Sequence, residues 1–451
     1  MPARVHRSFT VDLGSSLCVL LATTLGCSVG ARFDDRDDAA GLMGSTGGGA
    51  TETDSDAVPA GSSDGEGNGG SSSGSDGDGG SSSGFEDDHA YQKDIRIPAS
   101  GVSGTEDLVD FPVFVSLSDA DLHDRAQEDG CDIAFFQGST ALDFELERFE
   151  VEHDAAQAKL AAWVRVPSLA ATQDTVISLR YGLPCGSYED PIGVWGADYE
   201  LVWHMSSSAD SQVSDSTING FDGTLLGGPV IVDGKLGGSL VLDGVDDRVE
   251  GPLASELGVH GSAARTFSVW ASVQNYDATT WGSIFGIGRM GGGCCLYNGF
   301  GINRGSNTLS FSVGGEWIQN ANWSIFADGT GFDEWAYYAA VYDGDLGLRI
   351  HANGQLIEEV TLDAPLDTLD TSPLRLPYAD DYIIGGPRDE MRISRRVRSD
   401  DWITTEFANQ NDPESFYEVG PELAFPSSAH GREARELEHS VDLAPVEVHR
   451  Q

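Results

Sequence analysis

The sequence predicts an all-β protein built from two β-sandwiches. Apolar residues recur at every second position through residues 334–362, which is the pattern of strands with one buried face. The alternating positions of the first strand are Trp335, Tyr337, Ala339 and Val341. Asp343-Gly344 and Asn353-Gly354 then supply residues that tolerate the positive φ of tight turns, so we expect three antiparallel strands. Such a small sheet needs a second sheet to cover its apolar face.

Length and composition agree with this fold class. The chain has 451 residues, enough for two or three domains, and its 57 glycines are typical of a loop-rich β protein. The formal net charge is −47, from 73 acidic and 26 basic side chains. This charge repels phosphates and acidic polysaccharides and attracts divalent cations, so we exclude nucleic acid as a partner. Keeping an exported protein soluble is an equally good explanation of the charge.

Residues 1–27 have the build of a secretory signal. Basic residues precede an apolar run at 13–25 that is too short to span a bilayer. The run ends in Gly26-Cys27, which resembles the cleavage site of bacterial lipoproteins, although Thr24 stands where an aliphatic residue is usual. The resemblance implies acylation of Cys27 and anchoring at the outer membrane or cell surface. Cleavage with release of a secreted protein is the alternative.

The segments at 28–89 and 424–451 are expected to be disordered. Glycine, serine and aspartate dominate the first of them, and its apolar side chains are too few to offset the entropy cost of ordering the backbone. We therefore expect a flexible tether that holds a folded head away from the membrane. The tail at 424–451 is charged and has no strand or helix periodicity.

The first folded region is expected at 90–194. Apolar runs at 108–117, 162–166 and 175–182 predict strands, and 119–128 predicts a turn or short helix. The motifs of this region are, in order, Asp110-Phe111-Pro112-Val113, Asp129-Gly130-Cys131-Asp132-Ile133-Ala134-Phe135, Phe144-Glu145-Leu146-Glu147, Ala162-Trp163-Val164-Arg165-Val166-Pro167 and Leu179-Arg180-Tyr181-Gly182. This order resembles the bacterial domain of unknown function 2341, which implies a small β-sandwich with no established activity.

The second folded region is expected at 195–423. Its motifs are an Asp-Gly-x-Asp-Asp loop at 243–247, a tryptophan strand from 335 that leads to the Asp-Gly turn at 343–344, an Asn-Gly hairpin at 353–354 and an Asp-Glu-x-Arg-Ile strand at 389–393. Their combination resembles the laminin-G-like, concanavalin A-like lectin or glucanase jelly roll of bacterial surface proteins. Ser399, followed by two aspartates, predicts the N-cap of a short helix that closes the sandwich.

The resemblance implies a calcium site at the rim of the second sandwich. Calcium needs several oxygen ligands, which loops can bring together there. The candidate ligands are Asp243, Asp246, Asp247, Asp389 and Glu390. Alternatively, Asp243-Gly244 forms a plain turn. Glu390 would then pair with Arg392 or Arg395.

Exposed aromatic rings offer a second route to sugar binding, because a pyranose stacks its CH face on a ring. The stretch 275–332 is irregular and rich in glycine, so we expect loops over a sheet face there. The candidate ligand-binding residues in it are Trp281, Tyr297, Trp317 and Trp323. Some of these rings are expected to belong to the core instead.

The strand at 143–150 carries alternating carboxylates. Carboxylates on one strand face can serve as the acid and nucleophile of a retaining glycosidase, as in sandwich-fold glucanases. The middle aspartate of that pattern is missing, so we expect Glu145 and Glu147 to form a solvated acidic face and assign no catalytic residue. His204 and His351 lie in strand patterns and are expected to be packing or surface residues rather than ligands.

The cysteines fit an exported protein, because an oxidising compartment favours disulfides. Four cysteines remain after the signal region, and they allow three connectivities. We expect a disulfide between Cys131 and Cys185, which lie in one predicted domain. Cys294 and Cys295 are adjacent and would form a strained ring or stay reduced.

Together these features favour a tethered surface protein with a non-catalytic, lectin-like module that binds carbohydrate or matrix in an adhesion role. A structural or protein-contact component of the cell envelope is the alternative, and a glycoside hydrolase is the third. The sequence shows no nucleophile elbow, zinc motif or convincing carboxylate pair, so we do not expect an enzyme. Calcium is the one cofactor expected.

Overall fold

Strands dominate the protein, which confirms the predicted all-β class. The computed structural model describes residues 89–426, apart from residue 197 and the segments 207–210, 275–281, 289–299, 306–307, 314–315, 318–333 and 378–383. The predicted signal, most of the tether and Cys27 therefore lie outside the described residues. Among the described helices, none has the length and apolar character needed to cross a membrane.

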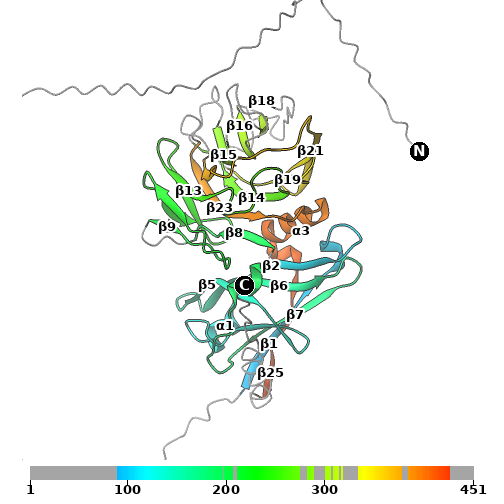
Figure 1. Cartoon of the computed structure of the whole chain (residues 1–451). Helices are drawn as coiled ribbons and strands as arrows, with labels where there is room; N and C mark the ends of the chain where they lie inside the picture. The colour runs from blue at the N-terminus through cyan, green and yellow to red at the C-terminus, as the bar shows by residue number, and fades with distance from the viewer. Residues whose placement is uncertain are drawn as a thin grey trace, which may run out of the picture. The chain divides into compact units, whose positions relative to one another are not determined.

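The first sandwich consists of two antiparallel sheets (Figure 1). One contains β1 (His89–Ile97), β7 (Thr175–Tyr181), β3 (Ala134–Gln137) and β4 (Thr140–Leu142). The other contains β2 (Leu108–Asp119), β6 (Gln157–Leu169) and β5 (Phe144–Glu152). The short helical elements are η1 (Ala99–Gly101), α1 (Ala120–Arg125) and α2 (Pro191–Trp195). The predicted strands and the short helix after 119 are thus confirmed.

The last described strands complete the sheet that contains β1. β24 (Glu418–Val419) and β25 (Leu423–Pro426) both pair antiparallel with β1, and the register places His89 opposite Pro426. A strand therefore crosses the boundary predicted at 423, and the first residues of the predicted tail, 424–426, belong to it.

The second sandwich has two larger antiparallel sheets. The sheet that we call the outer sheet contains, in spatial order, β18 (Glu316–Trp317), β17 (Thr308–Val313), β16 (Phe300–Gly305), β15 (Gly282–Ile287), β22 (Pro373–Leu376), β13 (Arg248–Leu253), β10 (Gly223–Leu226) and β9 (Gln212–Val213). The inner sheet contains β11 (Val230–Asp233), β12 (Gly238–Leu242), β23 (Gly386–Ser394), β14 (Arg265–Ser272), β19 (Trp335–Tyr342), β20 (Gly347–Ala352) and β21 (Gln355–Thr361), with β8 (Tyr199–Trp203) paired to β23.

The inner sheet is buried on both of its faces. Phe267 and Val269 of β14 pack in the core between the inner and outer sheets. Trp270 of the same strand and Tyr337 of β19 pack in a second core, which is continuous with the interior of the first sandwich. All nine residues of β23 are buried, including its charged ones. Polar side chains on this strand must therefore find partners inside the protein.

β19, β20 and β21 form the predicted antiparallel meander, and Asn353 and Gly354 have the positive φ values that its second turn requires. The prediction of a single buried face is wrong for β19. The residues that face the core between the two sheets are Ala336, Tyr338, Ala340 and Tyr342. Tyr337 and Ala339, which we expected there, pack on the opposite side. Alternation cannot identify the inward face of a strand that is covered on both sides.

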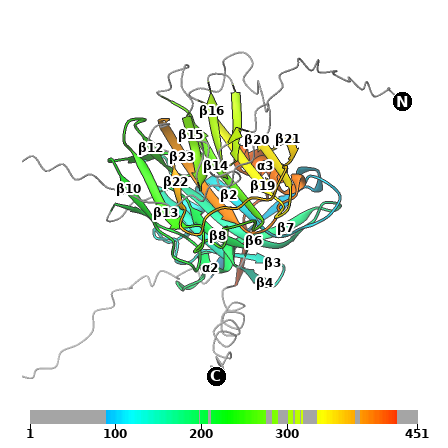
Figure 2. The ribbon, with the colours of Figure 1, turned by 45° about the horizontal axis from the view of Figure 1, so that its top comes forward.

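Helix α3 (Asp400–Asn411) begins at the predicted N-cap, since the Ser399 hydroxyl accepts a hydrogen bond from the Trp402 N–H at 3.1 Å. It lies beside β21 and β2 (Figure 2). The Asn409 side chain bonds both the N–H and the C=O of Phe114 in β2, at 2.7 and 2.9 Å. The helix, which is followed by α4 (Pro413–Phe416), thus joins the two sandwiches.

Cys131 and Cys185 form the predicted disulfide, with their Cα atoms 5.0 Å apart. The bond links the segment before β3 to the segment after β7, so both ends belong to the first sandwich. Cys294 and Cys295 lie outside the described residues.

Candidate functional site

A polar groove lies on the outer sheet, where β9, β10 and β13 are neighbours. Its volume is about 530 Å³, which falls within the range of ligand pockets. The groove is lined by Gln212, Gly220, Phe221, Asp222, Thr224, Leu226, Glu250, Gly251, Pro252 and Glu256. The lining combines hydrogen-bonding groups with one aromatic ring.

Strand register places four polar side chains of this face in one row, which we call the polar row. Thr224 of β10 is paired with Gln212 on one side and with Glu250 on the other. Glu250 is in turn paired with Arg375 of β22. Paired residues on neighbouring strands share a face. The adjacent residue Val249 packs in the core between the sheets, so the polar row faces away from that core.

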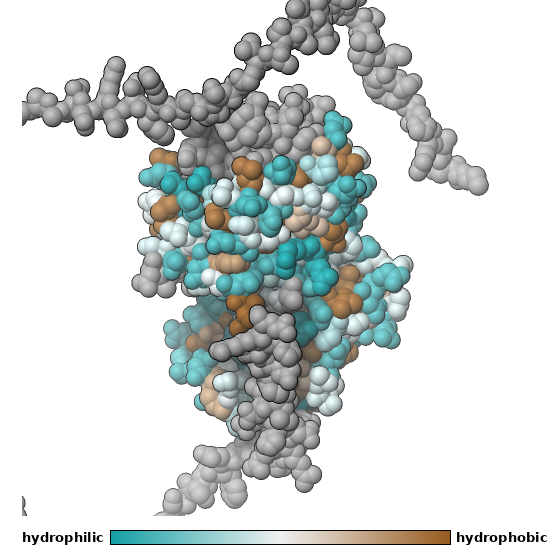
Figure 3. All heavy atoms as spheres, in the orientation of Figure 1, coloured by the Kyte–Doolittle hydropathy of each residue, from teal (hydrophilic) through white to brown (hydrophobic). Residues whose placement is uncertain are grey.

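Phe221 is held beside the polar row by a fixed loop. The Asp215 carboxylate accepts hydrogen bonds from the backbone N–H groups of Val202, Thr217 and Phe221. The Phe221 ring is half-buried against the core of the second sandwich. On the molecular face seen in Figure 3, apolar residues occur in small groups among hydrophilic ones. With the polar row on one side and the Phe221 ring on the other, the groove suits a hydrophilic ligand with one apolar face.

The sequence does not predict the polar row. Its strands β9, β10 and β13 are only two to six residues long, so each offers too few positions for a reliable period of two. The sequence Thr224-Leu225-Leu226 does not alternate between polar and apolar residues, so it does not indicate which side chains face the core.

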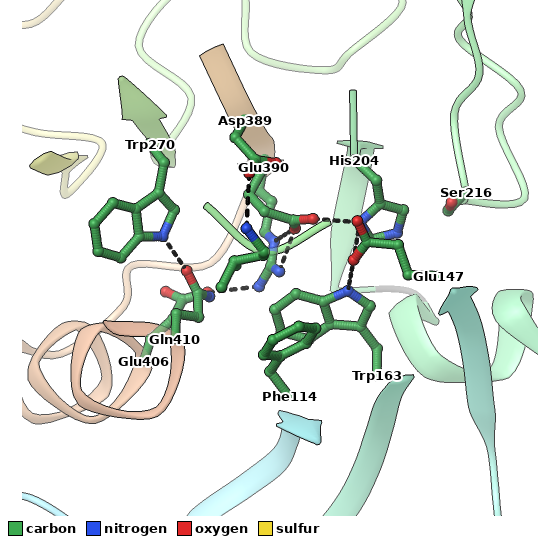
Figure 4. Close-up of polar contacts among 12 residues, drawn as sticks. Phe114, Glu147, Trp163, His204, Ser216, Trp270, Asp389, Glu390, Glu406 and Gln410 are labelled. Atoms are coloured by element: carbon green, nitrogen blue, oxygen red, sulfur yellow. Dashed lines mark hydrogen bonds and ion pairs between the residues drawn. The ribbon is translucent and has the colours of Figure 1, made fainter. Parts of the chain in front are cut away.

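A buried polar cluster lies where β5 approaches β8 and β23 (Figure 4). Glu145 and Glu147 belong to β5, His204 directly follows β8, and Glu390 belongs to β23. The predicted solvated acidic face is wrong: Glu145 is 9% exposed, and the Glu147 side chain is 1% exposed. The inner sheet covers this face of the first sandwich, which the sequence of β5 alone could not reveal.

Irregular strand pairing directs two of these carboxylates into the cluster. Leu146 is paired with Ala162 but Arg148 with Ala161, so Glu147 is the extra residue of a β-bulge. A second register shift lies in the pairing of β23 with β14, and there Glu390 has a positive φ of 53°. This conformation is costly for a residue with a side chain, by about 1–2 kcal/mol.

His204 lies between two carboxylates. Its Nδ1 is 2.7 Å from Glu390, and its Nε2 is 3.1 Å from Glu145. Glu145 also accepts hydrogen bonds from Trp195 and Ser216, at 2.6 and 2.7 Å. Burial opposes the charge of His204, but the two carboxylates raise its pKa well above the usual value. Burial likewise acts against ionised Glu145, yet His204 and the hydrogen bonds lower the pKa of Glu145 to about 2.

Arg392 connects this cluster to helix α3. It donates to Glu390 at 2.6 Å and to Glu406 of α3 at 2.9 Å. Its guanidinium carbon also lies 4.1 Å from the ring centre of Trp163 and is almost fully buried. The arginine therefore compensates two buried carboxylates at once.

Glu147 is the least satisfied member of the cluster. Its Oε2 accepts a hydrogen bond from Trp163 at 3.1 Å, but its buried Oε1 has no hydrogen-bond partner. Burial and the charge of Glu390 raise the pKa of Glu147 well above its usual value. Together with Glu145, His204 and Ser216 it lines a cavity of about 220 Å³.

The structure divides the five predicted calcium ligands. Asp243, Asp246 and Asp247 lie together in the loop after β12. Asp389 instead accepts bonds from the backbone N–H groups of Lys235 and Leu236, and Glu390 belongs to the buried cluster. In the loop, Asp243 Oδ1 accepts bonds from its own turn and Asp247 Oδ2 accepts one from the Asp243 N–H. The five carboxylates therefore do not form one site.

The predicted aromatic ligand-binding residues cannot be placed in the groove or the cluster. Trp281, Tyr297 and Trp323 lie outside the described residues, and of Trp317 only the backbone is described, in β18. His351 is fully buried and bonds Asp400 at 2.9 Å, as expected for a packing residue.

A comparison with protein families identifies the class of the second sandwich. Residues 243–404 match Laminin_G_3, described as the concanavalin A-like lectin/glucanases superfamily. This match confirms the predicted concanavalin A-like jelly roll. The family description covers lectins and glucanases alike, so it does not by itself distinguish binding from hydrolysis. The resemblance of 90–194 to the domain of unknown function 2341 stays a prediction.

Individual solved structures show weaker likeness. The binding domain of Paraclostridial Mosquitocidal Protein 1 has a TM-score of 0.37 and 11% identity, covering 47% of this chain and 52% of that one. Domain 4 of AbnA, an extracellular arabinanase from Geobacillus stearothermophilus in complex with arabinotriose, has a TM-score of 0.37 and 21% identity, covering 47% of this chain and 98% of that one. The receptor binding domain of a botulinum neurotoxin C/D mosaic serotype has a TM-score of 0.37 and 13% identity, covering 47% of this chain and 51% of that one. The chain spans about half the length of the two toxin domains. No curated protein matches the chain.

Proposed function

We propose that the second sandwich is a carbohydrate-binding module and that sugars bind in the groove on the outer sheet. The polar row beside Phe221 carries this proposal, because it lies in a sandwich of which residues 243–404 match the lectin/glucanase superfamily. Amide, hydroxyl and charged side chains can bond sugar hydroxyls, and an aromatic ring can cover the CH face of a pyranose. The net charge of −47 favours a neutral glycan over an acidic one.

Binding fits the groove better than hydrolysis does. Glycoside hydrolysis needs two carboxylates free to act as acid and as base or nucleophile. In the groove, Glu256 accepts a bond from the Leu253 N–H and Asp222 accepts one from the Asp215 N–H. Glu250 lies 3.5 Å from Arg375. These partners orient the carboxylates as fixed acceptors.

A glycan array tests the proposal with the full chain and two variants. We expect the wild type to bind neutral glycans and Glu250→Ala to lose at least most of that binding, since the row loses its central acceptor. Glu359→Ala serves as the matched control, because Glu359 is an exposed carboxylate on β21 of the inner sheet. Equal glycan binding by both variants would show that the groove is not the binding site. Release of reducing sugar would establish a hydrolase, and a fixed envelope partner without glycan binding would favour the structural alternative.

We further propose that the module is displayed at the cell surface through an acylated Cys27 and the glycine-rich segment at 28–89. The basic residues, apolar run and Gly26-Cys27 sequence support this location. Cells fed a fatty-acid probe should label the wild type and leave Cys27→Ala unlabelled. Equal labelling of both forms would contradict lipid attachment.

A further inference from the structure

We propose that Glu147, His204 and Glu390 bind a divalent transition-metal ion in the buried cluster. Each of the three offers one ligand atom, and these atoms all lie within 4.8 Å of one another. They come from β5, from the residue after β8 and from β23, and Figure 4 shows them directed toward one another. Zinc ligands at about 2.0–2.1 Å from the ion are about 3.4 Å apart, so small side-chain movements complete the site.

Each of the three ligands is also held by another residue. Nε2 of His204 bonds Glu145, and Oε2 of Glu390 bonds Arg392. Oε2 of Glu147, which lies 4.0 Å from Nδ1 of His204, accepts a bond from Trp163. A metal-ligating histidine usually donates its other N–H to a carboxylate, which sets the tautomer and the ring orientation. The contact with Glu145 leaves Nδ1 of His204 facing the two glutamates. Zinc would replace the proton at Nδ1, because only unprotonated imidazole nitrogen binds metal.

An unsatisfied oxygen of Glu147 supports the metal site. Glu147 Oε1 has no hydrogen-bond partner although the side chain is 1% exposed and lines the cavity. A buried polar atom without a partner costs free energy, typically about 1–3 kcal/mol. A metal ion bound to this oxygen would remove that cost. The bulge at Glu147 and the strained backbone at Glu390 are further features common at functional sites.

The donor set selects the kind of ion. Calcium and magnesium prefer oxygen ligands, whereas imidazole nitrogen suits zinc and similar transition metals. The adjacent cavity of about 220 Å³ leaves room for water as a further ligand. It is smaller than the pockets of about 300–1,000 Å³ that hold larger organic ligands. A metal ion with water therefore fits this cavity better than a sugar chain does.

Zinc chloride titrated into chelator-treated, full-length protein tests the proposal by calorimetry. We expect one zinc per chain in the wild type and none in Glu147→Gln, which keeps the shape of the side chain but removes its charge. Glu145→Gln should weaken zinc binding by about 10- to 100-fold, because Glu145 only positions the imidazole. Cobalt(II) in place of zinc should give visible absorption bands in the wild type alone.

Asp246→Asn is the control, since Asp246 is an exposed carboxylate of the other acidic cluster. It should bind zinc as the wild type does. Melting temperatures of the metal-free proteins verify that Glu147→Gln is folded. If wild type binds no zinc, or if Glu147→Gln binds it equally well, the site is refuted. Equal competition by calcium would also overturn the assignment.

Discussion

In the loop after β12, the carboxylates of Asp243 and Asp247 accept hydrogen bonds from the backbone of that same loop. In the buried cluster, side chains take the place of backbone donors: Trp163 of β6 donates to Glu147, and Glu390 contacts His204 and Arg392. The backbone N–H of Val245 and its neighbours lowers the pKa of Asp243, whereas burial raises that of Glu147. Asp243 and Glu147 thus have opposite electrostatic environments.

This difference shows why carboxylate density alone does not locate a site. The loop is rich in aspartate because a turn needs acceptors for its N–H groups, and Asp243 supplies them. The buried cluster keeps its carboxylates at a cost, so each must be compensated by a cation or a donor. Burial and an unsatisfied oxygen are therefore better indications of a binding site than the number of acidic residues.

The largest effect is expected from Arg392→Leu in the buried cluster. The variant leaves Glu390 and Glu406 without their shared cation, and breaking a buried ion pair in this way costs about 3–5 kcal/mol. Urea denaturation should show this loss in the free energy of unfolding. Arg396→Leu is the matched control, because Arg396 is 66% exposed and pairs with Asp198 at the surface. It should cost less than about 1 kcal/mol. Similar losses of unfolding free energy in both variants would show that the buried ion pairs contribute no more than the surface pair.

A smaller effect is expected from calcium binding at the loop after β12. The sequence predicts a calcium site with five ligands, and three of them, Asp243, Asp246 and Asp247, lie together in this loop. Calcium sites in extracellular modules have Kd values of about 0.1–1 mM. At a Kd near 1 mM, 10 mM calcium adds about 1.4 kcal/mol. The melting temperature should rise by about 3–6 °C. The rise should vanish in Asp247→Ala and persist in Glu147→Gln. A calcium-dependent rise that survives Asp247→Ala would place the ion elsewhere.

The sequence predicts the local features of the fold well. The Asn353-Gly354 turn and the Ser399 cap depend on residues whose preferences act over short distances. The Cys131–Cys185 disulfide spans 54 residues and is predicted because both cysteines lie in one domain. The inward face of β19 cannot be predicted from local residues, because the first sandwich and α3 pack on the inner sheet and bury Tyr337 as well. That packing depends on contacts between residues far apart in the chain.

The candidate sites depend even more on distant contacts. The bulges that direct Glu147 and Glu390 have no signature in the sequence, since neither position is a glycine or proline. His204 gains its partners from strands that are 59 and 186 residues away. The polar row likewise needs the register of four short strands, and residue patterns do not specify that register.

The pairing of β1 with β25 has a consequence for biosynthesis. β1 is the first described strand, yet the strand that covers one of its edges ends at Pro426. While the second sandwich is being made, this edge of β1 has its N–H and C=O groups unpaired, and open edges promote aggregation. Domains commonly fold in order from the N-terminus as they are synthesised. Here the first sandwich closes only after β24 and β25 emerge, so a fragment ending before residue 418 would carry an open edge.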